Sequence, residues 1–164
     1  MSSAILRRLL PASELDRTRR EEIIAALNQD LTCTISLAIS AKQAHWNVEG
    51  PNFQGLHELF DVIAAEAREW SDLLAERLVT LGGTAHATVE DLSASGLQRF
   101  PRDERRWDSL TGSLHDHLLS AAESMRRHAR DMEDEMATQD IYVEILRTLE
   151  KRAWMLRAHL EESL

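Results

Sequence analysis

The stretch from Leu56 to Leu81, LHELFDVIAAEAREWSDLLAERLVTL, has the apolar spacing of one long amphipathic helix. Its apolar residues recur every three or four positions and form a single stripe: Leu56, Phe60, Ile63, Ala67, Trp70, Leu74, Leu78 and Leu81. Away from this stripe, within an arc of roughly 100°, lie four polar side chains, His57, Asp61, Asp72 and Glu76. Imidazole and carboxylate groups together suit iron or zinc. The helix therefore predicts a core stripe and, pointing away from that core, a candidate metal-binding face.

The two ends of this polar face are too far apart to bind one metal ion within a single chain. His57 and Glu76 are about 28 Å apart along a continuous helix, whereas metal–ligand bonds measure about 2 Å. An antiparallel copy of the helix, related by a two-fold axis near residues 66 and 67, would place residues 57 and 61 opposite residues 72 and 76. Ala64 and Ala65 are small enough to permit that approach. The spacing predicts two identical sites in a homodimer.

His45 adds a further imidazole to this face. It ends the preceding helical stretch, and the break from Asn47 to Pro51 can fold it back beside His57. A second interpretation stays open at this point, because polar residues opposite a core stripe are also what a simply solvated helix face shows.

The remaining pattern indicates four long helices and a crossover. They are expected over about 20–46, from Asn52 as N-cap to about 81, from 103–107 to about 132, and from a cap at Thr138 or Asp140 to about 162. Gly82-Gly83 ends the second helix, and Thr88 begins a short helix in the long central connection. These features predict an all-α, ferritin-like four-helix bundle over residues 20–164, preceded by an N-terminal extension over residues 1–19.

Composition supports one helical domain in a reducing compartment. The chain has 164 residues, of which 43% are hydrophobic, with only 6 Gly and 3 Pro. The single Cys33 excludes a disulfide framework and is expected to be a buried, inert thiol. No apolar run approaches the length of a membrane span, and the N-terminus does not resemble a secretion signal. A cytoplasmic protein is the expectation.

The net charge of −9 argues against a basic surface that coats nucleic acid. A basic cluster near the start of the chain is interleaved with acidic residues and is interpreted as a salt-bridged lead-in rather than a DNA-binding arm: Arg7, Arg8, Arg17, Arg19 and Arg20.

Several motifs resemble the Dps family, the mini-ferritins. They are KQAHWNVEGPNFQGLHELFD at residues 42–61, Asp72, Ala75-Glu-Arg77, Leu81-Gly-Gly83 and EKRAWMLRAHL at residues 150–160. The resemblance covers roughly residues 20–162 and implies a hollow shell of twelve subunits. It also implies ferroxidase centres at two-fold interfaces, with three ligands from one subunit and two from the other: His45, His57 and Asp61, then Asp72 and Glu76.

The same resemblance implies the chemistry. Fe²⁺ would be oxidised, preferably by hydrogen peroxide, and stored as a ferric mineral, which protects DNA from oxidative damage. Trp46 is either an electron donor or radical trap, or an interface packing residue. Asp116 and Glu123 are candidates for an iron-entry pore, with plain solvation as the alternative. His115 and His117 are expected at the surface.

Two other functions are weighed against iron storage. Some family members bind DNA through lysine-rich tails and associate with the nucleoid, but the N-terminal segment of this sequence has no lysine. Twelve copies would carry a total charge of roughly −108, which repels phosphate. DNA binding is therefore expected to be weak. An intrachain di-iron enzyme is disfavoured, because no histidine follows a glutamate by three residues.

Overall fold

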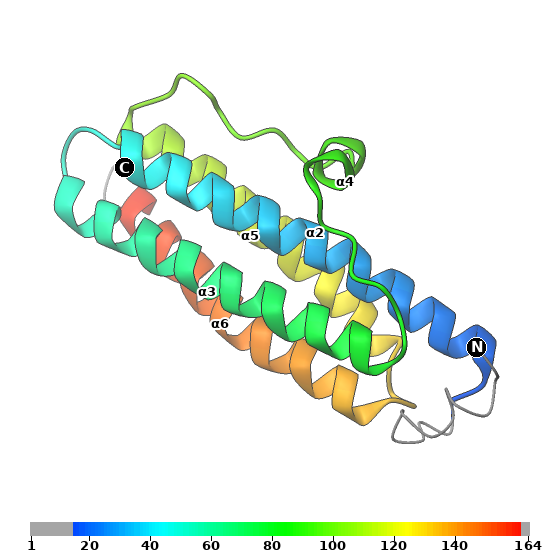
Figure 1. Ribbon diagram of the computed structural model, residues 1–164. Helices are drawn as coiled ribbons and strands as arrows, with labels where there is room; N and C mark the ends of the chain where they lie inside the picture. The colour runs from blue at the N-terminus through cyan, green and yellow to red at the C-terminus, as the bar shows by residue number, and fades with distance from the viewer. Residues whose placement is uncertain (1–14, 162–164) are drawn as a thin grey trace.

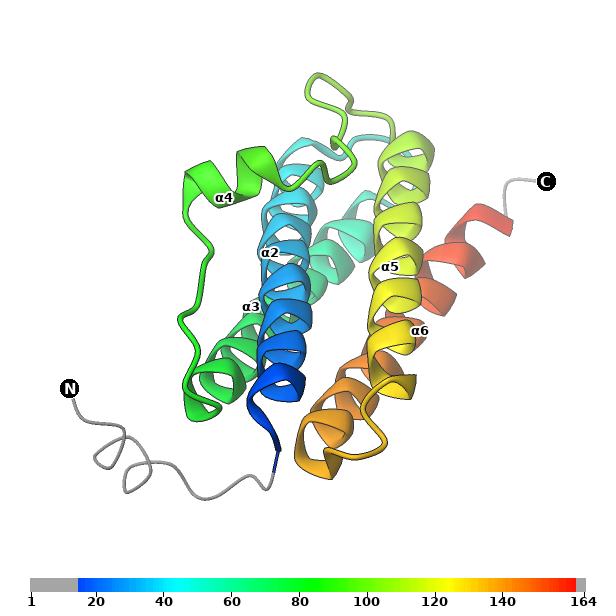
Figure 2. The same ribbon diagram turned by 90° about the vertical axis from the view of Figure 1, so that its right-hand side faces the viewer.

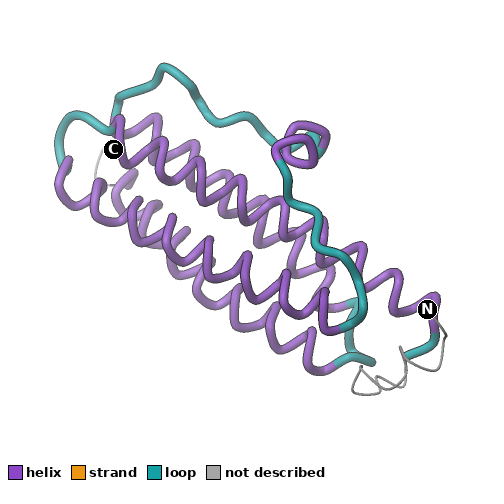
Figure 3. Tube along the Cα trace, in the orientation of Figure 1, coloured by secondary structure: helices purple, strands orange, loops and turns teal. Residues whose placement is uncertain are grey.

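The computed structural model describes residues 15–161, and this part of the chain folds into five α-helices without a strand (Figures 1 and 3). Arg7 and Arg8 of the basic cluster, and most of the predicted 1–19 extension, lie outside the described residues. The four long helices lie side by side as a bundle, and the short helix α4 lies beside them (Figures 1 and 2). The predicted four-helix bundle with a short extra helix is confirmed.

Helices α2 (Arg17–Asn47) and α3 (Phe53–Thr80) form an antiparallel pair. Their register is fixed at three levels. The rings of His45 and His57 stack at one end, Ser71 donates a hydrogen bond to Thr34 Oγ1 at 2.9 Å midway, and Asn28 Nδ2 reaches the Thr84 carbonyl at 3.1 Å beyond the other end. This pairing brings the end of the first helix next to the start of the second.

Helices α5 (Trp107–Arg130) and α6 (Met136–Glu161) form the second antiparallel pair. The end of α3 is joined to the start of α5 by a long connection that contains α4 (Val89–Ala94) and runs the length of the bundle (Figures 1 and 2). Across the two pairs, α2 contacts α5, and α3 contacts α6 through Arg152, which pairs with Glu66 at 2.5 Å. The core lies between these four helices.

The apolar stripe of α3 is buried as predicted, with every member at most 4% exposed: Leu56, Phe60, Ile63, Ala67, Trp70, Leu74, Leu78 and Leu81. Cys33 is mostly buried, and burial together with the charge of Asp30 raises the pKa of its thiol to about 12. The raised pKa agrees with the prediction of an inert thiol, but Cys33 is partly rather than fully buried.

Several helix boundaries follow the sequence signals. Helix α2 ends at Asn47, just before the Gly50-Pro51 break, and α3 ends at Thr80, before Gly82. Thr88 and Asp91 form the expected capping box, since the Thr88 hydroxyl accepts from the Asp91 N–H and the Asp91 carboxylate accepts from the Thr88 N–H.

One predicted cap lies at its expected position without a capping hydrogen bond, and the other is wrong. Asn52 stands at the N-cap position of α3 but has a left-handed backbone (φ 63°), and its side chain makes no capping hydrogen bond. Helix α6 begins at Met136, so neither Thr138 nor Asp140 caps it. Instead, the Glu135 carboxylate accepts from the Thr138 N–H at 3.0 Å and from Arg77 of α3 at 2.6 Å. Arg77, which is distant in the sequence, thus helps to hold Glu135 at the start of α6, and the helix begins earlier than its local sequence predicts.

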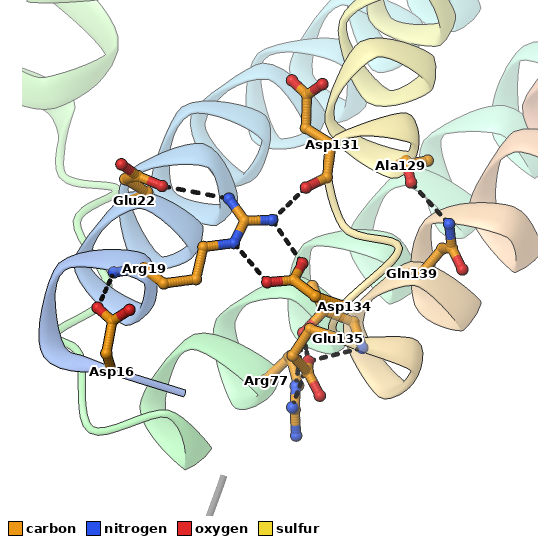
Figure 4. A network of polar contacts seen from close by, with 10 residues as sticks. Asp16, Arg19, Glu22, Arg77, Ala129, Asp131, Asp134, Glu135 and Gln139 are labelled. Carbon is orange, nitrogen blue, oxygen red and sulfur yellow. Dashed lines mark hydrogen bonds and ion pairs between the residues drawn. The ribbon is translucent and has the colours of Figure 1, made fainter. Parts of the chain in front are cut away.

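Polar contacts at the same end of the bundle join α2 to the turn between α5 and α6 (Figure 4). Helix α2 begins three residues earlier than predicted. Its N-cap is Asp16, whose carboxylate accepts a hydrogen bond from the Arg19 N–H at 3.0 Å. The Arg19 guanidinium pairs with Asp134 at 2.7 Å and also contacts the Asp131 carbonyl. These contacts hold the start of α2 against the turn.

By length and composition, α2 is apolar enough to cross a membrane, which corrects the expectation that no stretch comes near that limit. Half of the apolar window is buried inside the bundle. Because a core helix of a bundle is also largely apolar, the packing of Ile23, Leu27 and Leu31 accounts for this composition.

Candidate metal centre

His45 and His57 lie together although they belong to different helices. Their ring centroids are 3.7 Å apart and the planes are inclined by 22°. His45 Nδ1 lies 2.7 Å from the His57 carbonyl oxygen, and His57 Nδ1 lies 2.8 Å from the His45 carbonyl oxygen. The predicted approach of the two imidazoles across the Asn47–Pro51 break is confirmed.

This reciprocal pair of hydrogen bonds fixes how each ring can act. A carbonyl oxygen only accepts, so each Nδ1 must carry the proton and donate it. In the neutral ring the lone pair is then on Nε2, the atom that can bind a metal. The backbone contacts therefore leave Nε2 of each ring as the nitrogen that could bind a metal.

Asp61 is the anionic neighbour of the two histidines, and its side chain is about half exposed. Lys42 of α2 donates to Asp61 Oδ1 at 2.6 Å. This hydrogen bond, more than the nearby charges of Lys42, His45 and His57, lowers the pKa of Asp61 and keeps it ionised. Sequence reasoning missed Lys42, although its position three residues before His45 places both on one side of the helix.

Asp72 and Glu76 lie further along α3, and both are exposed. Within residues 15–161 neither side chain makes a hydrogen bond or ion pair, and no three His, Cys, Asp or Glu side chains gather closely enough to hold a metal ion. One chain brings His45 and His57 together, with Asp61 near enough for their charges to affect its pKa, and leaves Asp72 and Glu76 further along the helix. The geometric argument that a single chain cannot assemble all five agrees with this arrangement.

Trp46 follows His45 and is 68% exposed. The Lys42 ammonium lies 5.8 Å from the centroid of its ring. The indole also borders a groove on α2 and α3, whose other lining residues are half apolar and half polar or charged: Ile35, Ala38, Ile39, Lys42, Arg68 and Ser71. An exposed indole beside His45 is compatible with both roles considered for Trp46, an electron donor or radical trap and a packing residue of an interface.

The candidate pore residues Asp116 and Glu123 are both exposed on α5.

The expectation that His117 lies at the surface is wrong, because its side chain is only 8% exposed and its ring packs edge-on against Phe100. Burial lowers the pKa of His117. Phe100, which covers His117, belongs to the connection before α5, and the periodicity of a helix cannot predict such a contact. His115 is partly buried rather than fully at the surface.

Comparisons with known proteins agree with this architecture. The ferritin-like domain family matches residues 24–163. The DNA protection during starvation protein of Agrobacterium fabrum is 36% identical over 160 residues, which cover 92% of this chain and 94% of that protein. The protein of the same name from Halobacterium salinarum is 35% identical over 155 residues and covers 92% and 85% of the two chains.

Solved structures show the same fold. Dps from Mycobacterium smegmatis in a tetragonal crystal form superposes with a TM-score of 0.87 at 28% identity, covering 93% of this chain and 94% of that one. Dps from Microbacterium arborescens, described in a high iron form, superposes with a TM-score of 0.79 at 29% identity and covers 93% and 99%. With the family match spanning most of its length, this chain belongs to the Dps family of ferritin-like proteins.

Proposed function

We propose that this protein stores iron and oxidises Fe²⁺ at centres shared by two subunits. His45, His57 and Asp61 of one subunit would meet Asp72 and Glu76 of a second copy across a two-fold axis. The observation that carries the proposal is the reciprocal hydrogen bonding of His45 and His57, which leaves two Nε2 lone pairs beside an ionised carboxylate. Such a mixed set suits Fe²⁺, which is the substrate here.

Each ligand has a separate role in the proposal. Asp61 and Glu76 are the tightest ligands, because anionic oxygen binds iron in both oxidation states. His45 and His57 complete the coordination, and Asp72 binds iron directly or orients a ligand or water. Trp46 is either an electron donor or radical trap next to His45, or a packing residue of the subunit interface. The complementary carboxylates lie on the same helix face, which supports a symmetric contact.

The oxidant is proposed to be hydrogen peroxide in preference to dioxygen. One peroxide accepts two electrons, one from each of two Fe²⁺ ions, so its O–O bond breaks without release of a hydroxyl radical. The Fe³⁺ formed hydrolyses and mineralises inside a hollow shell of twelve subunits in the cytoplasm. Asp116 and Glu123 on α5 are proposed to attract Fe²⁺ to the entry pore. The relatives named for DNA protection, and the neighbour described in a high iron form, support this function.

Rapid mixing tests the proposal. Protein loaded anaerobically with Fe²⁺ is mixed with hydrogen peroxide, and the near-ultraviolet absorbance of the ferric product is followed. We expect His57→Ala and Glu76→Ala each to slow the fast phase by at least roughly 10- to 100-fold. Glu58→Gln is the matched control, since this exposed side chain forms a hydrogen bond only with Gln54 among the described residues, and the substitution should leave the rate unchanged. Parental rates in both site variants would contradict the proposal.

A further inference from the structure

The loop between α2 and α3 is held by the segment that leads into α5. The Glu49 N–H donates to the Arg105 carbonyl at 2.8 Å, and the Trp107 N–H donates to the Glu49 carbonyl at 3.1 Å, which forms an isolated parallel bridge. Glu49 and Arg105 also pair through their side chains at 2.5 Å. Figure 1 shows the end of the long connection arriving next to this loop.

Gly50 and Trp107 add a close packing contact to the bridge. Gly50 has φ of 115°, a backbone conformation that favours glycine. A Cβ atom at this position would lie 2.8 Å from Trp107 Cδ1, so the indole packs directly on the glycine backbone. We call Glu49, Gly50, Arg105 and Trp107 the loop clamp.

Two residues of the loop clamp, Glu49 and Gly50, lie in the segment that joins His45 to His57. His45 and His57 each donate to the backbone of the other, so a change in the separation of the two helix ends would lengthen both hydrogen bonds together. Hydrogen bonds weaken steeply as length and angle depart from their optimum. The clamp ties this loop to α5, whose residues Leu110 and Leu114 are buried in the core. Because α5 is anchored in the core, the loop clamp restricts movement of the α2–α3 loop and so of the histidine pair at its two ends.

We infer that Trp107, with the bridge to Glu49, is a positioning element for the metal site: it holds the α2–α3 loop so that His45 and His57 present their Nε2 atoms together. The inference rests on the proposed function. Within residues 15–161 the Trp107 ring makes no aromatic contact with either histidine, so it would act through the loop. Supporting groups that orient metal ligands typically change metal affinity by 10- to 100-fold.

Anaerobic titration with Co²⁺, a probe that reports ligand geometry in its visible spectrum, tests the inference in the assembled protein. We expect Trp107→Ala and Gly50→Ala to weaken Co²⁺ binding by roughly 10- to 100-fold and to alter the bound-Co²⁺ spectrum. Trp107→Phe keeps a ring over Gly50 and should restore the affinity to within about threefold of the parent. Gly112→Ala is the control, because a Cβ there would contact nothing within 4 Å in this chain.

The outcomes separate this inference from the proposed function. If His57→Ala abolishes Co²⁺ binding while Trp107→Ala and Gly50→Ala bind with parental affinity and spectrum, the positioning role is wrong and the metal site stands. If His57→Ala binds Co²⁺ like the parent, the site itself is wrong. Should Trp107→Ala fail to fold, Gly50→Ala and Trp107→Phe decide: parental binding in Gly50→Ala overturns the inference, and weakened binding in it with recovery in Trp107→Phe supports it.

Discussion

Lys42 and a metal ion would compete for the same carboxylate. The ammonium lies 2.6 Å from Asp61 Oδ1, where it keeps Asp61 ionised but also occupies an oxygen that iron would need. The pair is partly exposed, so solvent screening keeps its contribution to stability small. Lys42 therefore competes with both a proton and a metal ion for the Asp61 carboxylate, and the balance between these two effects depends on pH.

Replacing Lys42 with methionine should reveal both effects. At neutral pH Asp61 is ionised with or without Lys42, so Lys42→Met should bind Co²⁺ about two- to fivefold more tightly, because no ammonium competes. On acidification this advantage shrinks, because protons then compete with Co²⁺ for Asp61. The parent lowers the pKa of Asp61, and the variant loses that effect, so its binding should fall off at a higher pH than in the parent. Co²⁺ titrations from neutral to acidic pH measure this.

The exposed Lys151 on α6 provides the control, since Lys151→Met removes the same charge away from the centre. Equal pH profiles for Lys42→Met and Lys151→Met would show that Lys42 has no part in the site.

Among the helices, one set of polar contacts lies in the core of the bundle rather than at its surface. Asp30 of α2 is fully buried and accepts from Ser124 at 2.9 Å and from His128 at 2.5 Å, both on α5. The buried Tyr142 of α6 lies near it, and burial, followed by the charge of Asp30, raises the pKa of that phenol. One carboxylate thus organises polar groups from three helices.

Truncating this carboxylate should be costly. Asp30→Ala leaves the groups of Ser124 and His128 without their partner, and losing one member of a buried pair costs about 3–5 kcal/mol. Thermal unfolding at a fixed protein concentration should show a much lower midpoint than for Asp140→Ala, which removes an exposed carboxylate of α6. A midpoint like that of the control would show that the cluster does not stabilise the bundle.

These elements also show what sequence can and cannot predict. The helices and the α3 stripe follow from periodicity, and the breaks at Gly50-Pro51 and Gly82-Gly83 from backbone chemistry. The histidine pair follows from the shortness of one loop. The Glu135–Arg77 contact, the cover over His117 and the Glu49–Trp107 bridge join residues far apart in the sequence, and a local pattern carries no information about them.

For the whole molecule, charge opposes DNA binding. The chain carries −9, so an assembly of many copies is strongly negative and repels phosphate. We expect no retention of DNA in a gel shift at moderate ionic strength, and only weak retention at low salt. Tight retention at moderate salt would contradict this and would favour the DNA-compacting alternative. Reversing the charge of Asp116 alone should leave the result unchanged.

Two subunits jointly binding iron is the claim on which the whole account depends, and a mixing experiment tests it directly. His57→Ala and Glu76→Ala chains are refolded separately and together, and fast iron oxidation is measured in dimers verified to contain one chain of each kind. Each variant alone should lack the fast phase. The mixed dimer should recover one intact site out of two, and therefore about half of the parental amplitude. Absence of any recovery in verified mixed dimers would contradict a shared centre.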